Sequence, residues 1–148
     1  MPLHISDKLR PKLLALRAKQ LQHPHCDELL IEQEVIVLTL GFGPAFYLGL
    51  DGRVIIWHYM NDESPRATEN IAEIAGGLVI GAKTYDLPEL YDLLPSCPVG
   101  GVRCRTCGGH RWVQYGGRVG DWFVCWECNG LGWRDAEPGA DELSRSSS

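Results

Sequence analysis

Apolar residues recur along residues 5–22 with the period of an α-helix. The apolar stripe is made of Leu9, Leu13 and Leu16, with Gln20 continuing it. Proline is tolerated in the first turn of a helix, where its missing N–H has no intrahelical partner anyway. Pro11 therefore places the start of the regular helix near Arg10. We expect the opposite face to be solvated, since it is basic and consists of Lys8, Lys12, Arg17 and Lys19.

Residues 34–60 hold a long apolar stretch and predict three β-strands, at residues 34–40, 45–50 and 53–60. Asp51-Gly52 separates the last two strands and predicts a type I′ hairpin turn, because Gly adopts positive φ without steric cost. The strands do not alternate between apolar and polar positions, as a sheet with one face in water would. We therefore expect both faces to be covered. Helices would cover one face, and the C-terminal part, the N-terminal segment or a partner chain the other.

The segment from residue 61 to residue 95 completes the first domain. It predicts, in order, a polar loop at 61–70, a short helix at 67–75 ended by Gly76-Gly77, a strand at 78–83 and a helix at 86–94. Asp86 and Glu89 have the spacing of a capping box, and Pro88 fits the first helical turn. Residues 1–95 thus predict an α+β domain in which helices flank a small antiparallel meander.

Two Cys-x-x-Cys pairs, Cys104/Cys107 and Cys125/Cys128, dominate the C-terminal part of the sequence. Pairs at this separation are typical of a site in which four thiolates surround one metal ion, and Zn²⁺ suits this donor set. A metal-binding turn bends the chain sharply, and the residue after each pair then needs positive φ. Those residues are Gly108 and Asn129, which tolerate that conformation best.

The sequence between the two pairs predicts a β-hairpin. Residues 110–115 and 122–124 are rich in β-formers, and residues 116–121 have the composition of a turn. A hairpin between two cysteine turns predicts a zinc ribbon over residues 103–134. The segments on either side of the ribbon are not predicted to form strands or helices. Residues 96–102 read as a linker and residues 135–148, polar and serine-rich, as a disordered tail.

Composition narrows the class of protein. The length of 148 residues fits one domain and a small module, and the net charge of −5 is carried by residues 1–95, where 13 acidic residues face 8 basic ones. The N-terminus has no apolar core of a signal peptide, and the apolar run at residues 35–50 is shorter than the ~20 residues of a membrane span. We expect a soluble cytoplasmic protein, in which reduced cysteines bind metal rather than form disulfides.

The sequence Cys125–Gly132 fits the pattern Cys-x-x-Cys-x-Gly-x-Gly, and Cys104–Gly109 fits its first six positions. His110 and Arg111 replace the end of the pattern in the first copy. Both copies resemble the repeat of the cysteine-rich domain of DnaJ-type chaperones, which carry four repeats and two zinc ions. The resemblance covers residues 104–132 and implies one ion held by the two repeats. It implies metal binding far more than chaperone activity, because such repeats recur in unrelated proteins.

Residues 40–95 resemble the SUKH superfamily, whose members include bacterial toxin-immunity proteins. The shared features are an apolar strand, the hairpin Tyr47-x-x-x-Asp51-Gly52-x-Val54, a polar loop and a closing helix with Pro88-Glu89-Leu90. This resemblance implies a protein that binds a toxin.

The metal site predicts a structural role, because four cysteines fill a coordination shell in which a catalytic zinc keeps one position open. Cys97 and His110 are the other residues near enough in sequence to replace a ligand. The sequence holds no Gly-x-Ser-x-Gly, His-Glu-x-x-His or paired-carboxylate pattern, so we do not expect an enzyme. It predicts a zinc-binding module that acts through contact with a protein partner or a second copy.

Three other functions stay open. Iron in a rubredoxin-like site uses the same four thiolates. Cys-x-x-Cys also occurs in dithiol redox catalysts, although it then usually opens a helix. Nucleic-acid binding is the third: residues 103–134 carry a charge of +3, and their five tryptophan and tyrosine side chains are able to stack on bases. Four thiolates around Zn²⁺ would reduce that charge to about +1, which is little for a phosphate-binding surface.

Overall fold

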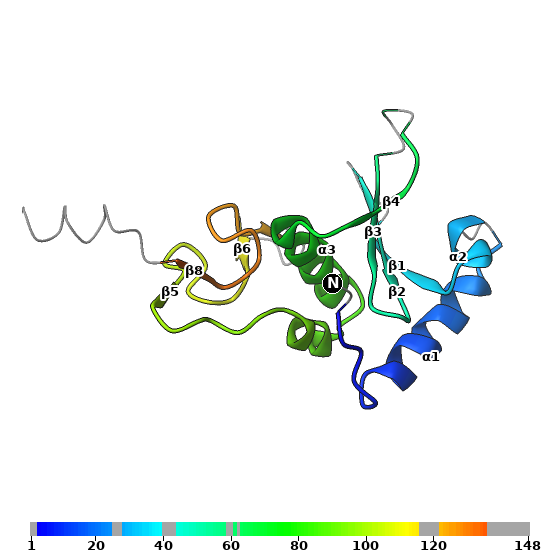
Figure 1. Cartoon of the computed structure of the whole chain (residues 1–148), viewed down its shortest axis with the longest axis horizontal. Coiled ribbons are helices and arrows are strands. Elements are labelled where there is room, and N and C mark those ends of the chain that lie inside the picture. Colours follow the sequence, from blue (N-terminus) through cyan, green and yellow to red (C-terminus); the bar gives the residue numbers. More distant parts are fainter. Residues whose placement is uncertain are drawn as a thin grey trace, which may run out of the picture. The chain divides into compact units, whose positions relative to one another are not determined.

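The computed structural model describes residues 3–24, 28–39, 44–58, 61, 63–115 and 122–135. The chain divides into two compact units, Met1–Leu94 and Pro95–Ser148, called here the N-terminal and C-terminal units. Their elements appear in chain order in Figure 1. Among the described residues, no helix has both the length and the apolar character needed to cross a membrane.

A four-stranded antiparallel sheet forms the centre of the N-terminal unit, with the strands in sequence order. Its strands are β1 (Val35–Thr39), β2 (Ala45–Gly49), β3 (Val54–Trp57) and β4 (Arg66–Thr68). This meander confirms the predicted α+β class and the first three strands. The predicted fourth strand at 78–83 is wrong, because those residues are helical. The fourth strand is β4, which lies inside the predicted loop.

The turn between β2 and β3 differs from the predicted type I′ turn. Gly52 alone in this turn has positive φ, at 92°, whereas a type I′ turn needs two such residues. The N–H of Gly52 donates to the carbonyl of Gly49, and the N–H of Gly49 donates to Arg53 O. The loop thus has three residues. A Cβ at Gly52 would collide with the backbone of Leu3, whose N–H donates to Gly52 O at 2.8 Å.

Helix α3 (Ile71–Thr84) packs on one face of the sheet (Figure 1). It begins at Asn70, whose side chain caps the N–H groups of Ala72 and Glu73. The predicted stop at Gly76-Gly77 is wrong. A Cβ at Gly77 would lie 2.8 Å from the Phe46 ring, so this glycine permits a close approach of helix to sheet. Tertiary packing therefore outweighs the weak helix propensity of glycine here.

The short helix α2 (Glu28–Glu32) packs on the other face of the sheet. Leu29 and Leu30 join a buried cluster whose remaining members are Val35, Val37, Ala45, Tyr47 and Ile55, with Trp57 packed against it. Strand β2 is buried along its whole length. Both faces are therefore covered, as the sequence predicted, and the second face is covered by α2, a helix that was not predicted.

Helix α1 (Arg10–Leu21) has proline in its first turn, as predicted, and lies along the edge strand β1. The Gln20 amide donates to Val37 O at 2.9 Å and accepts from Val37 N at 2.8 Å. The Arg17 guanidinium donates to the carbonyls of Leu30, Gln33 and Val35. The prediction that Arg17 belongs to a solvated face is thus wrong. Its side chain and Gln20 satisfy backbone groups that an open sheet edge would expose.

The last element of the N-terminal unit is a 3₁₀ helix, η2 (Pro88–Leu93), where an α-helix was predicted. The predicted capping box is absent from it. Asp86 has φ of 51° and Leu87 occupies the N-cap without a side-chain bond. Glu89 instead contacts Lys12 of α1, with 2.6 Å between Oε1 and Nζ. The contact links η2 to α1.

The C-terminal unit contains two pairs of short antiparallel strands. The strands are β5 (Gly101–Arg103), β6 (Trp112–Gln114), β7 (Trp122–Val124) and β8 (Trp133–Asp135). The β6–β7 pair is the predicted hairpin. The β5–β8 pair was not predicted: β5 begins inside the expected linker and β8 ends at the first residue of the expected tail. Residues 116–121 and 136–148, the predicted turn and most of that tail, lie outside the described residues.

Adjacent glycines of α3 allow a matched test of the helix–sheet contact. A Cβ at Gly76 meets nothing within 4 Å, whereas one at Gly77 meets Phe46. We expect Gly76→Ala to raise the free energy of unfolding by about 0.5–1 kcal/mol. Gly77→Ala is expected to lower it by about 1–3 kcal/mol through overpacking. Urea denaturation measures both values, and equal effects of the two substitutions would contradict the assigned packing.

Candidate metal centre

The two Cys-x-x-Cys segments form a pair of equivalent turns. We call residues 104–111 the first knuckle and residues 125–132 the second. Each knuckle lies between two strands, β5 and β6 for the first and β7 and β8 for the second. The strand before each knuckle pairs with the strand after the other one. Backbone bonds continue this exchange, since Cys104 N–H donates to Gly132 O and Cys125 N–H donates to Arg111 O. The unit is therefore an internal repeat with approximate two-fold symmetry.

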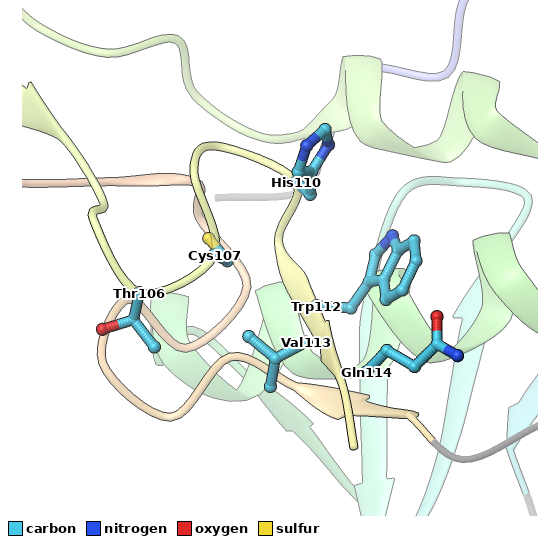
Figure 2. A pocket seen from close by; sticks show the side chains of 6 residues that line it. All are labelled: Thr106, Cys107, His110, Trp112, Val113 and Gln114. Carbon is cyan, nitrogen blue, oxygen red and sulfur yellow. The ribbon is translucent and has the colours of Figure 1, made fainter. Parts of the chain in front are cut away.

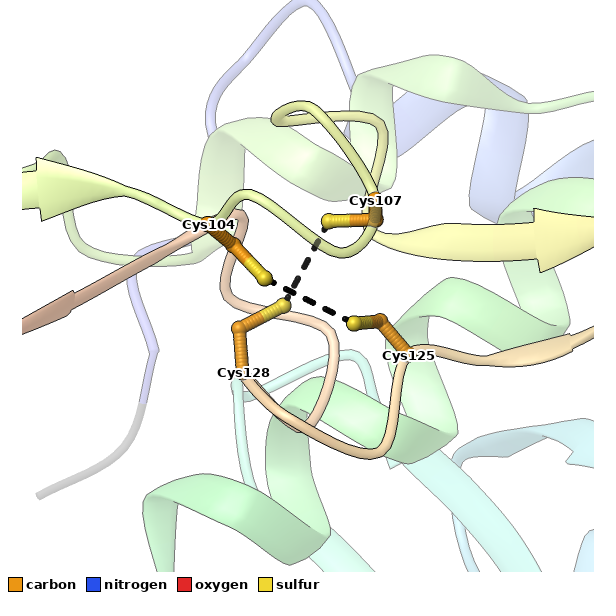
Figure 3. Close-up of side chains that lie close together, drawn as sticks. All are labelled: Cys104, Cys107, Cys125 and Cys128. Carbon is orange, nitrogen blue, oxygen red and sulfur yellow. Dashed lines mark hydrogen bonds between the residues drawn. The ribbon is translucent and has the colours of Figure 1, made fainter.

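The four predicted ligands meet between the knuckles, with their sulfur atoms pointing at one centre (Figure 3). The Sγ atoms of Cys104 and Cys125 are 3.7 Å apart, and so are those of Cys107 and Cys128. All four Sγ atoms lie within 4.8 Å of one another. For a metal–sulfur bond of ~2.3 Å, a tetrahedral site has sulfur–sulfur edges of about 3.8 Å. The cluster therefore fits one tetrahedral ion.

In each knuckle, a backbone N–H group donates a hydrogen bond to the sulfur of the second cysteine. Arg111 N–H donates to Cys107 Sγ at 3.4 Å, and Gly132 N–H donates to Cys128 Sγ at 3.3 Å. The chain reaches these positions through a run of residues with positive φ, namely Gly108, Gly109 and Arg111 in the first knuckle and Asn129, Gly130 and Gly132 in the second. The predicted need for positive φ after each pair is thus confirmed. The N–H groups are oriented to stabilise negative charge on sulfur.

The four thiols are buried, and their ionisation is uneven. Burial raises the pKa of Cys125, and burial with the neighbouring Cys107 and Cys125 thiols raises the pKa of Cys128 to about 12. Burial also opposes ionisation of Cys104. The N–H groups of Cys107 and Thr106 and the neighbouring thiols outweigh that effect, so the pKa of Cys104 falls below its ordinary value. A cation placed among these sulfurs would stabilise their thiolate forms, and a metal ion is such a cation.

The cysteines also form the hydrophobic centre of the C-terminal unit. They make one buried cluster against which Val113 packs. The two replacement ligands considered from the sequence lie apart from it. Cys97 and His110 are both exposed, and neither belongs to the group of side chains whose ligand atoms converge. The described part of the chain thus offers a donor set of four sulfurs.

Thr106 and Glu127 occupy equivalent positions in the two knuckles and touch across the site. The Thr106 hydroxyl donates to Glu127 Oε2, and this oxygen lies 3.9 Å from Cys104 Sγ. Glu127 Oε1 lies 3.9 Å from an Arg134 guanidinium nitrogen. Sequence reasoning missed this contact. The 21-residue offset between the two pairs would have paired these positions, but it does not say that the side chains face each other.

A pocket of about 400 Å³ lies beside the first knuckle (Figure 2). Its lining is mixed in polarity and consists of Thr106, Cys107, His110, Trp112, Val113 and Gln114. The imidazole of His110 and the indole of Trp112 are 6.5 Å apart between ring centres. The pocket reaches Cys107, but the sulfur of that residue faces the other three cysteines (Figure 3).

No protein-family model, no curated protein and no solved structure matches this chain. The site therefore has to be interpreted from its own geometry. That geometry provides four buried sulfurs at tetrahedral spacing and supports them by N–H groups of the chain.

Removal of one sulfur tests the site. We expect Cys128→Ser to lose the bound metal, because three sulfurs and a hydroxyl bind the ion far more weakly. The resonances of residues 101–135 in an amide NMR spectrum should then collapse, while those of the N-terminal unit persist. Elemental analysis gives the metal content. Cys97→Ser is the matched control and should keep both the metal and the spectrum. A chelator that leaves the spectrum of the C-terminal unit unchanged would contradict a structural metal.

Proposed function

We propose that the C-terminal unit is a structural zinc-binding module. The convergence of four buried sulfurs carries this proposal. Zinc favours tetrahedral sites made of cysteine, and four protein ligands exclude the open position of a catalytic zinc. Structural zinc contributes ~10–16 kcal/mol of apparent binding free energy in finger peptides, where it is folding free energy. Among the described residues of this unit, the buried apolar side chains are the four cysteines themselves, so the metal would supply most of its stability.

The proposed function of the whole chain is protein–protein contact without catalysis. Large aromatic side chains on the C-terminal unit support it. Trp126 is 67% exposed, Tyr115 53% and Phe123 40%. The rings of Tyr115 and Phe123 lie against each other, 5.3 Å between centres. Tryptophan and tyrosine are enriched in the centres of protein interfaces, and their exposure on a small rigid module fits such a role.

The charges of the C-terminal unit favour a protein partner over a nucleic acid. Arg111 binds carbonyls of the second knuckle, and Arg134 lies beside Glu127. Both cations are thus engaged within the unit, and a four-thiolate zinc site adds negative charge. Among the described residues of the unit, the arginines left exposed are Arg103 and Arg105. Nucleic-acid binding depends on many phosphate contacts, and these two side chains offer few.

The C-terminal unit resembles one protein family and the N-terminal unit another. The knuckle sequences resemble the DnaJ-type repeat, which supports zinc as the ion. The SUKH resemblance of residues 40–95 makes a toxin one kind of partner, for which the four-stranded meander offers a framework. We place the contact surface on the C-terminal unit, because that is where the large exposed aromatic side chains gather.

The identity of the metal is tested by metal analysis of the full chain. We expect about one zinc per chain and a colourless protein, whereas a red protein containing iron would overturn the zinc assignment.

In affinity capture from the source cell, the double substitution Phe123→Ser/Trp126→Ser should lose a protein that the wild type retains. Ile71→Ser, which changes an exposed apolar residue of the N-terminal unit, is the control. Equal recovery with both variants would contradict the proposed surface.

A further inference from the structure

The two-fold repeat of the C-terminal unit is broken at Arg111. Gly132 occupies the equivalent position of the second knuckle, with φ of 81°, and Arg111 has nearly the same φ, 77°. Glycine adopts this conformation freely, but a side chain carries backbone strain there. The same position is where the first copy departs from the Cys-x-x-Cys-x-Gly-x-Gly pattern. An arginine at a strained position indicates that its side chain has a compensating role.

The Arg111 side chain crosses from the first knuckle to the second. Its Nη1 donates to Leu131 O at 2.7 Å and to Gly130 O at 3.2 Å. Both carbonyls directly follow the turn that holds Cys128. Hydrogen bonds from a charged donor are stronger than neutral ones, and the guanidinium is half-buried here. The contact therefore ties the first knuckle to the carbonyls beside a ligand of the second.

The backbone of Arg111 adds two contacts of the same kind. Its N–H donates to Cys107 Sγ within its own knuckle, at 3.4 Å. Its carbonyl accepts from Cys125 N–H, at 3.0 Å, in the other knuckle. Gly132 makes the matching backbone contacts, to Cys128 Sγ and Cys104 N–H, but it has no side chain to reach across. Arg111 thus contacts both halves of the site, with the side chain supplying the asymmetric link.

We infer that Arg111 is a positioning residue that holds the two knuckles together and thereby slows release of the metal. The inference rests on the proposed zinc-binding function. Release requires the knuckles to separate, since the four sulfurs are divided between them and are buried. The guanidinium must break its bonds to Gly130 and Leu131 before that separation. The site is therefore built to retain its ion rather than to exchange it.

The release rate of zinc from the full chain tests this role. A chromogenic chelator in excess, 4-(2-pyridylazo)resorcinol, captures the released ion. We expect Arg111→Gly to raise the rate on the order of tenfold, since a charge-assisted link is lost. Arg111→Lys keeps the charge but not the planar guanidinium, so its rate should lie between the two. Arg103→Gln is the control for charge, because Arg103 is an exposed side chain of β5, outside both knuckles, that makes none of these contacts.

Two further measurements separate positioning from a general loss of structure. The cobalt-substituted proteins should show the same absorption bands for wild type and Arg111→Gly, since the four sulfurs are unchanged. The zinc content of each variant is measured before release begins. An Arg111→Gly rate within twofold of wild type, or an equal effect of Arg103→Gln, would overturn the inference while leaving the zinc site intact. Altered cobalt bands would also overturn it, because they would show that the substitution changes the sulfur ligands themselves. A wild-type protein that contains no zinc would contradict the proposed function as well.

Discussion

The C-terminal unit depends on the charge of four buried sulfurs. Burial and the neighbouring Cys107 and Cys125 thiols raise the pKa of Cys128 to about 12, and a cation among the four sulfurs would offset this effect. The same sulfurs form the centre of the only buried cluster described in that unit. If the proposed ion is bound, its binding and the folding of this unit would be one process, as in small metal-stabilised modules. The strands and knuckles around the cluster are too short to hold together by apolar burial alone.

The N-terminal unit depends on a different contact, the close approach of α3 to the sheet. Gly77 and Gly81 lie against Phe46 and Leu38, where a Cβ would come within 3 Å of the ring or side chain. On the opposite side of this unit, α2 closes the second face, and Gln20 and Arg17 of α1 bond the backbone of the edge strand. The sheet has no need of the C-terminal unit to cover its faces. This division is consistent with a stable domain that carries a separate, metal-dependent module.

The internal repeat of the C-terminal unit divides the four sulfurs between its two knuckles. Two nearly equivalent knuckles contribute two sulfurs each, so neither holds an ion without the other. Thr106 and Glu127 meet at equivalent positions, and Arg111 crosses between the halves from a strained conformation. These side-chain contacts lie outside the set of four sulfurs, and contacts of this kind orient the ligands of a metal site. The proposed contact with a partner would cost less entropy if these contacts also fix the exposed aromatic side chains in place.

The sequence by itself determined the features that local chemistry controls. The spacing of the cysteines, with Gly108 and Asn129 after each pair, identified the knuckles because the turn geometry follows from a few adjacent residues. Apolar β-formers identified β1, β2 and β3 in the same way. Tertiary structure decided the rest. The sequence predicted that Gly76-Gly77 would end a helix, but the fit of Gly77 under Phe46 extends α3 through them. Likewise β4, the β5–β8 pair and the reach of Arg111 depend on partners distant in sequence, which no local pattern records.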